Sequence, residues 1–229
     1  MNESSPRSVR VWDAPVRIFH WLMVLSFAGA WLTAESERWR LVHVTLGYTM
    51  AGLVVFRLVW GVVGTRHARF ADFVRGPAAV GRYLRSLLQR RPEPHAGHNP
   101  AGGWAILALL VLAVLATVSG WAVYADLGGK WIEEAHEFAA SAMLVLVVVH
   151  VAGVLLGSWL HRENLVRAMI TGRKRADEAG QGVGAAGLVA ALLLAAVVGF
   201  WIVQWQAPPV LHAQGGAQRD GGEAGDHDD

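Results

Sequence analysis

The sequence of 229 residues contains no cysteine. This absence excludes disulfides, thiolate-bound iron–sulfur clusters and the C-x-x-C-H attachment of a c-type haem. Charged residues are also few, at 17%, whereas 54% of the residues are hydrophobic and 11 are Trp. A soluble domain carries more charge than this, so the composition indicates an integral membrane protein in a lipid bilayer. The small net charge of +2 gives no reason to expect nucleic acid as a partner.

Five hydrophobic runs are long enough to cross a bilayer. About 20 helical residues span the roughly 30 Å of hydrocarbon, and the runs cover residues 18–34, 41–64, 103–124, 132–160 and 183–205. The first run is short, but Asp13 is a suitable N-cap and Pro15 suits a first helical turn. We therefore predict five transmembrane helices, the first of which begins before Val16. A cleaved secretory signal is the weaker interpretation, because the run lacks a clear A-x-A site.

Basic residues are distributed unevenly between these runs. Arg7, Arg10 and Arg17 precede the first run, seven arginines lie between positions 66 and 91, and five basic residues lie between positions 162 and 175. In the first loop two basic residues are balanced by Glu35 and Glu37, and in the third loop Lys130 is outnumbered by Asp126, Glu133 and Glu134. By the positive-inside rule, we predict a multi-pass membrane protein with a cytoplasmic N-terminus and a C-terminus on the outside.

Two segments outside the runs have a distinct character. Residues 77–89 fit a short amphipathic helix lying on anionic headgroups. The segment 207–229 is rich in Gly, Asp and Glu, so we predict a disordered acidic tail. His212 and His227 within it fit solvated tail residues better than metal ligands.

Four histidines lie within the apolar runs: His20, His43, His136 and His150. A polar ring in hydrocarbon is costly without a partner, so each histidine is a candidate functional residue. His136 and His150 are 14 residues apart, which places them on one helix face about 21 Å apart. Measured from the charged first loop, His20 and His43 differ in depth by about 18 Å. Depth therefore pairs His43 with His136 near the outer surface and His20 with His150 nearer the cytoplasm.

Paired histidines on facing helices form the kind of core site in which helix bundles hold a cofactor, and imidazole suits iron. Without cysteine, a haem here would be held by histidine alone. Two axial nitrogens fill the coordination of the iron, which favours electron transfer over oxygen chemistry. We therefore predict two stacked haems with these four histidines as axial ligands. The alternative is that each histidine only forms a hydrogen bond to a neighbouring helix.

Three further residues have two interpretations each. Arg57 follows His43 by 14 residues and so faces the same way at the inner depth. It can pair with a propionate of the inner haem or extend to the interface. Gly47 and Gly153, close in sequence to candidate ligands, can make room for a porphyrin or allow close helix packing.

A second group of polar residues lies at the cytoplasmic ends of the runs: His98, Asn99, His161 and Arg162. A quinone carbonyl needs hydrogen-bond donors and a proton supply, which such residues offer. We therefore treat them as candidate quinone-site residues. Interfacial histidines that are merely hydrated are the alternative.

Several motifs extend the pattern beyond hydropathy: VWDAPVRIFHW (11–21), HVTLGY (43–48), FRLVWGVVGTRHARFADF (56–73), GHNP (97–100), HE (136–137), the histidine at 150 and HRENLVRAMITG (161–172). Together they resemble the bacterial cytochrome b561 family, which is similar to the b-type cytochrome subunits of nickel–iron hydrogenases and to formate dehydrogenase gamma subunits. The resemblance covers about residues 9–175. It implies an all-α four-helix membrane bundle that binds two haem b groups through His20, His43, His136 and His150.

The resemblance also divides the chain into a family domain at 1–175, an additional transmembrane helix at 176–206 and a periplasmic tail at 207–229. It implies a protein of the bacterial inner membrane with a periplasmic C-terminus, which transfers electrons between a membrane quinone and a periplasmic partner. That partner is a c-type cytochrome or a hydrogenase or dehydrogenase subunit. A quinone site near the cytoplasmic face, as in related dehydrogenase subunits, would lie close to Asn99. The added helix and tail depart from the family pattern and favour a small c-type cytochrome over a hydrogenase.

Two other functions stay open. Some family members resemble superoxide oxidases, so a freestanding superoxide:quinone oxidoreductase is the alternative enzyme, with Lys130 near the outer haem to attract the anion. A haem-free transporter or structural anchor is the third possibility, but its polar residues should line a path rather than pair by depth.

Overall fold

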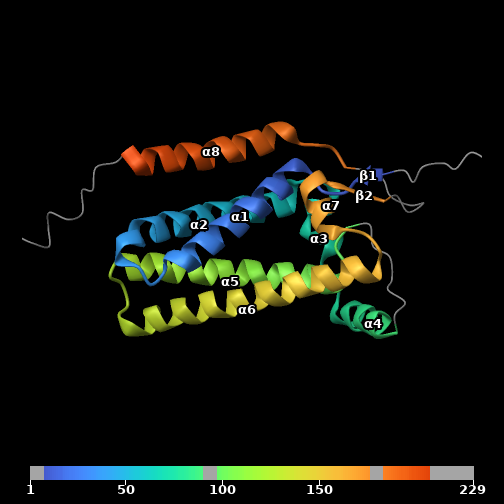
Figure 1. The fold of residues 1–229 in the computed structure, drawn as a ribbon, viewed down its shortest axis with the longest axis horizontal. Helices are drawn as coiled ribbons and strands as arrows, with labels where there is room; N and C mark the ends of the chain where they lie inside the picture. Colours follow the sequence, from blue (N-terminus) through green and yellow to red (C-terminus); the bar gives the residue numbers. More distant parts are fainter. Residues whose placement is uncertain (1–7, 90–96, 176–182, 207–229) are drawn as a thin grey trace, which may run out of the picture.

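The computed structural model describes residues 8–89, 97–175 and 183–206. Within them, five helices are long and apolar enough to cross a membrane: α1 (Ala14–Thr33), α2 (Arg40–Val63), α5 (Pro100–Tyr124), α6 (Lys130–Leu160) and α8 (Gly187–Gln206). Helices α1, α5 and α8 run in one direction, and α2 and α6 run in the other (Figure 1). The prediction of an all-α membrane bundle with a fifth helix is therefore confirmed.

The short elements lie mainly at one end of the bundle (Figure 1). They are η2 (Arg66–Ala68), α3 (Phe70–Phe73), α4 (Pro77–Leu88), α7 (Leu165–Thr171) and the strands β1 (Ser8–Arg10) and β2 (Arg173–Arg175). Most basic residues lie on or beside these elements, so we call this the basic end. The opposite end carries η1 (Glu37–Trp39) and the α5–α6 turn, where Asp and Glu predominate, and we call it the acidic end. That the basic end faces the cytoplasm remains a prediction.

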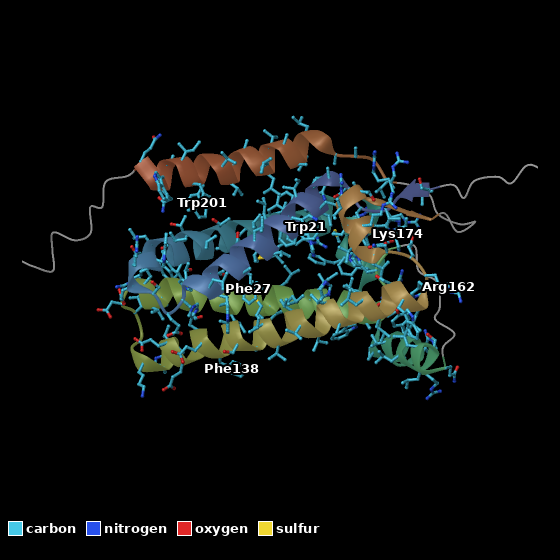
Figure 2. All side chains as sticks on the ribbon, viewed as in Figure 1. Trp21, Phe27, Phe138, Arg162, Lys174 and Trp201 are labelled. Carbon is cyan, nitrogen blue, oxygen red and sulfur yellow. The ribbon has the colours of Figure 1, made fainter. Side chains whose placement is uncertain are left out.

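The bundle core is small and apolar. Helices α5 and α6 pack together, α1 packs against α2, and α2 packs against α5. Their shared core contains Met50, Val54, Ala113 and Met143. The outward faces carry large apolar side chains, such as Phe138, which points away from the bundle with 71% of its surface exposed (Figure 2). Such large apolar side chains are suited to contact with acyl chains.

Asp13 connects the start of α1 to the end of α2. Its buried carboxylate accepts the N-capping hydrogen bond from the Val16 amide at 2.8 Å, as the sequence predicted. It also accepts hydrogen bonds from Trp60 Nε1 at 3.0 Å and Thr65 Oγ1 at 2.6 Å. The sequence predicted only the cap, because the other two donors are about 50 residues away along the chain.

An antiparallel pair of short strands, β1 and β2, closes the basic end and was not predicted. The amide groups of Val11 and Trp12 donate to the carbonyl of Gly172 at 2.8 and 3.1 Å. Gly172 has a φ of 77°, and a Cβ atom there would lie 2.6 Å from the Trp12 carbonyl oxygen. Glycine is therefore required at this turn for both its backbone conformation and its size.

The fifth helix begins later than the hydropathy predicted. The apolar run starts at residue 183, but α8 starts at Gly187, because the preceding residues join the basic end instead. The Val183 amide donates to the Arg10 carbonyl at 2.9 Å, and the Ala14 amide donates to the Ala185 carbonyl at 3.0 Å. These two hydrogen bonds hold the segment against the start of α1.

Helix α8 packs along α1 and contacts α2. Trp201 points from α8 toward the bundle (Figure 2), and its Nε1 donates to Thr49 Oγ1 at 3.1 Å. The amphipathic helix predicted at residues 77–89 is confirmed as α4, Pro77–Leu88. The predicted acidic tail at 207–229, with His212 and His227, lies outside the described residues.

Candidate functional site

His43 on α2 and His136 on α6 face each other near the acidic end, and we call them the acidic-end pair. Their ring centroids are 6.2 Å apart, with an interplanar angle of 84°. Two metal–imidazole bonds of about 2 Å each, together with the half-widths of two rings, also span about 6 Å. The rings are therefore spaced to bind one metal ion between them.

Backbone carbonyls orient both rings of the acidic-end pair. His43 Nδ1 is 2.8 Å from the Ala30 carbonyl oxygen, and His136 Nδ1 is 2.9 Å from the Ala116 carbonyl oxygen. Both carbonyls can only accept, so each Nδ1 carries the proton and each Nε2 keeps its lone pair. Metal-ligating histidines are held in this way, because the second hydrogen bond sets the tautomer and the ring orientation.

A cavity of about 650 Å³ adjoins the acidic-end pair. That volume is in the range of cofactor and small-ligand sites. Gly47 lines the cavity, and a Cβ atom there would meet nothing within 4 Å. A Cβ at Gly120 would lie 2.8 Å from His136 Cε1, so Gly120 makes room for the ring itself. Gly47 thus lies against open space, and the alternative of close helix packing does not apply there.

His20 on α1 and His150 on α6 are the second predicted pair, which we call the basic-end pair. The His20 ring packs edge-on against Trp21, with the ring centroids 5.1 Å apart. His20 Nδ1 is buried and has no hydrogen-bond partner among the described residues. Gly153, near His150, is exposed, and a Cβ there would meet nothing within 4 Å. The basic-end pair is therefore less constrained by hydrogen bonds than the acidic-end pair.

Arg57 on α2 is buried, with 3% of its surface exposed. Its guanidinium carbon lies 4.9 Å from the centroid of the Phe70 ring and 5.8 Å from that of Phe73. Gly61 lets the Phe70 ring lie over Arg57, because any Cβ atom at position 61 would overlap that ring. Helix α3 therefore closes over Arg57, and the side chain does not extend to the interface.

His98 lies between two aromatic rings, 4.3 Å from Trp12 and 4.7 Å from Phe73 by ring centroids. Its Nδ1 is buried and unpartnered among the described residues. Burial lowers the pKa of His98 to about 3, and the positive charges of Arg57 and Lys174 add to the effect, as do His67 and His150. His98 is therefore neutral at physiological pH, rather than a hydrated surface histidine.

The other candidate quinone residues are more dispersed. Asn99 Oδ1 accepts from the Gly102 amide at 2.7 Å, so this side chain caps α5. His161 ends α6 and is half-buried, and Arg162 is exposed at the same end of the bundle as Lys174 (Figure 2). The structure thus brings these residues to one end, but it separates the enclosed His98 from the exposed Arg162.

The basic end also holds a polar pair that the sequence reasoning missed. His67 is buried, and its Nδ1 lies 2.8 Å from Asp72 Oδ2. Arg66 lies 3.5 Å from the other carboxylate oxygen of Asp72. The spacing of five residues between His67 and Asp72 was visible in the sequence, but their contact depends on the turn between η2 and α3.

Comparison with known proteins gives a consistent result. The family described as prokaryotic cytochrome b561 matches residues 11–172. The probable Ni/Fe-hydrogenase B-type cytochrome subunit of Rhizobium leguminosarum bv. viciae is 25% identical over 215 aligned positions, which cover 73% of this chain and 89% of the relative. The protein of the same description from Azotobacter chroococcum mcd 1 is 28% identical over 212 positions, covering 72% and 88%. No solved structure matches the chain.

Proposed function

This chain belongs to the prokaryotic cytochrome b561 family, and we propose that it is a di-haem cytochrome that carries electrons across the membrane between a quinone and a periplasmic redox protein. As a family member it is a b-type membrane cytochrome and an electron carrier. The observation that carries the proposal of haem binding is the acidic-end pair, whose ring centroids are 6.2 Å apart with each Nδ1 facing a backbone carbonyl.

In this proposal His43 and His136 hold one haem b, and His20 and His150 hold the second. When bound, each haem supplies an iron that gains and loses one electron. The chain's own residues orient the ligands and exclude water. The carbonyls of Ala30 and Ala116 hold the two imidazoles in the tautomer that leaves Nε2 free. A haem held by two imidazoles would be suited to electron transfer rather than oxygen binding.

The two pairs are separated along the membrane normal. His136 and His150 lie 14 residues apart on the continuous helix α6, which corresponds to about 21 Å. This distance is most of the roughly 30 Å hydrocarbon thickness. We propose that the basic end faces the cytoplasm by the positive-inside rule, so that electrons pass between the two faces through the two sites.

The acidic end is then the docking side for the redox partner. The names of the curated relatives point to a nickel–iron hydrogenase. Helix α8 lies beyond the family match at residues 11–172, so a c-type cytochrome or a dehydrogenase subunit is a partner of equal standing in this proposal. We place quinone exchange at the basic end, near Asn99, His161 and Arg162, with Asn99 using its amide group because its oxygen caps α5.

The alternative of a superoxide:quinone oxidoreductase finds less support at the acidic end. Lys130 Nζ lies 3.7 Å from Glu134, which neutralises its attraction for an anion. Glu35 and Glu137 line the cavity beside the acidic-end pair and repel superoxide. Quinone reduction by the purified protein in a superoxide-generating system, abolished by superoxide dismutase, would reverse this preference.

The first test is the dithionite-reduced minus oxidised spectrum of the full-length protein, with haem b quantified per chain. The expected result is two haems per chain, whereas fewer than two in fully loaded wild-type protein would contradict the proposal. Transmembrane transfer is then tested in liposomes with ferricyanide entrapped inside and a quinol added outside. Reduction of the entrapped ferricyanide should require the protein, and a variant lacking either histidine of the acidic-end pair should lose it.

A further inference from the structure

Arg57 is a buried cation that lacks an adequate partner within the described chain. Its side chain is 3% exposed, two Phe rings cover it, and its Nη1 makes no hydrogen bond to a described residue. Aromatic faces attract a guanidinium, but they accept no conventional hydrogen bond. A buried charge that is neither paired nor hydrogen-bonded destabilises a fold. The surroundings of Arg57 are therefore suited to binding an anion.

Asp13 is the carboxylate whose charge acts on Arg57, but it is already engaged. Its two oxygens accept from the Val16 amide, Trp60 Nε1 and Thr65 Oγ1, at distances between 2.6 and 3.0 Å. These three donors fix the carboxylate at the junction of α1 and α2. Asp13 thus moderates the charge of Arg57 at a distance, and Nη1 stays free to bind another acceptor.

His98 adds a second unpartnered nitrogen beside Arg57. Both side chains lie against the Phe73 ring, His98 with its ring centroid at 4.7 Å and Arg57 with its guanidinium carbon at 5.8 Å. His98 Nδ1 is buried and has no partner among the described residues. Burial keeps the pKa of His98 low, so the neutral ring offers one N–H donor. A cation and a neutral donor on one aromatic ring form a site suited to a carboxylate.

The helix register places this site beside the basic-end pair. His43 and His136 face each other, and both α2 and α6 run from the acidic end to the basic end (Figure 1). Arg57 follows His43 by 14 residues, as His150 follows His136, so Arg57 and His150 lie at the same level.

We infer that Arg57 and His98 form an anion site that binds a propionate carboxylate of the haem held by His20 and His150. This inference rests on the proposed function. A quinone does not satisfy the site, because its neutral carbonyl leaves the buried guanidinium charge uncompensated. The propionate brings a full negative charge, and Arg57 and His98 both donate hydrogen bonds to it. Both residues position the haem and set its potential, and neither takes part in electron transfer itself.

The test measures the midpoint potentials of both haems in the full-length protein by spectroelectrochemical titration. Arg57→Gln should lower the potential of the basic-end haem, because an uncompensated propionate stabilises the ferric iron. His98→Leu should lower it less, since a neutral donor is lost. The matched control is Arg66→Gln, which removes an exposed arginine from the same end and should leave both potentials unchanged. The acidic-end haem should keep its potential in all three variants.

A second readout reports on the carboxylate directly. With haem labelled with ¹³C at its propionate carboxyl carbons, the redox-induced infrared band should shift in Arg57→Gln and His98→Leu but not in Arg66→Gln. If Arg57→Gln loses the basic-end haem, Arg57→Lys should retain it, because the charge is kept. Loss of that haem in both variants would contradict a role for the charge.

Three results separate the possible failures. Wild-type protein without two b haems would refute the proposed function as well as this inference. Two haems with unchanged potentials and infrared bands in Arg57→Gln would refute the anion site alone. If the effect of Arg57→Gln disappears when quinone is extracted from the protein, the site binds quinone and the propionate assignment is wrong.

Discussion

The two histidine pairs differ in how far the chain alone prepares them. At the acidic end, backbone carbonyls orient both rings, the ring centroids are 6.2 Å apart, and a cavity of about 650 Å³ adjoins them. At the basic end, His20 Nδ1 has no described partner, and two further unpartnered nitrogens, on Arg57 and His98, are buried nearby. The first pair is therefore oriented by backbone hydrogen bonds, whereas the second has buried nitrogens nearby without a hydrogen-bond partner among the described residues.

This difference follows from the surroundings of each pair. Near the acidic end, α1 and α5 pass close to the rings, so their carbonyls at Ala30 and Ala116 are available as acceptors. At the basic end, Asp13 and Arg57 are buried charged residues, and Asp13 already accepts hydrogen bonds from three donors. Charged side chains near a haem change its reduction potential, whereas hydrogen bonds from ligand histidines to backbone carbonyls fix the orientation of the imidazole rings.

The largest expected effect is selective loss of one haem. His43→Ala should abolish the acidic-end haem and keep the other, because the ligands of the two pairs are independent. His20→Ala should do the reverse. Haem b per chain, measured as the pyridine haemochrome, should fall from two to about one in each variant, since each removes one axial ligand. Loss of both haems in a folded variant would show that the pairs are not separate sites.

A smaller loss of haem is expected when a side chain is placed in the cavity than when a ligand histidine is removed. Gly47→Leu places a side chain in the cavity beside His43, so it should lower the occupancy of the acidic-end haem several-fold while the basic-end haem remains. Gly52→Leu is the matched control on the same helix. A Cβ atom at Gly52 would also meet nothing within 4 Å, but Gly52 does not line the cavity. Equal haem content in the two variants would contradict a haem in this cavity.

Asp13→Ala should destabilise the fold at the basic end without removing a predicted haem ligand. It removes the α1 cap and leaves two donors on α2 and after it without their acceptor. We expect the free energy of unfolding to fall by about 2–5 kcal/mol. The measurement is a thermal or denaturant transition in detergent. Asp13→Asn keeps one accepting oxygen and should be milder, and an unchanged transition in Asp13→Ala would show that the contacts are not stabilising.

The smallest effect is expected for α8, which contributes no residue to either pair. Trp201→Phe removes the hydrogen bond to Thr49 but keeps most of the packing. We expect destabilisation of about 1 kcal/mol, the usual net value of one hydrogen bond. Haem content and both potentials should stay at wild-type values, and a changed potential would mean that α8 influences a haem site. Thr49→Val provides the complementary variant from the other side of the bond.

Much of the fold was predictable because hydrocarbon imposes one simple rule, that each spanning segment be apolar for about 20 residues. The start of α1 was also predictable from Asp13 and Pro15, because an N-cap is a local interaction between residues three positions apart. The start of α8 was misplaced by hydropathy, because Val183 is held by the Arg10 carbonyl. The strands β1 and β2 were missed, since no local pattern marks a pair that joins the two ends of the family domain.

The sequence by itself determined the helical membrane class, the 14-residue spacings and the asymmetry of charge. These are local or periodic properties, and helix geometry converts them into depth and face. Only the tertiary structure decided which carbonyls orient His43 and His136, that α3 closes over Arg57, and that His98 is enclosed by Trp12 and Phe73. Those contacts join residues far apart in the chain, so they depend on how the helices pack.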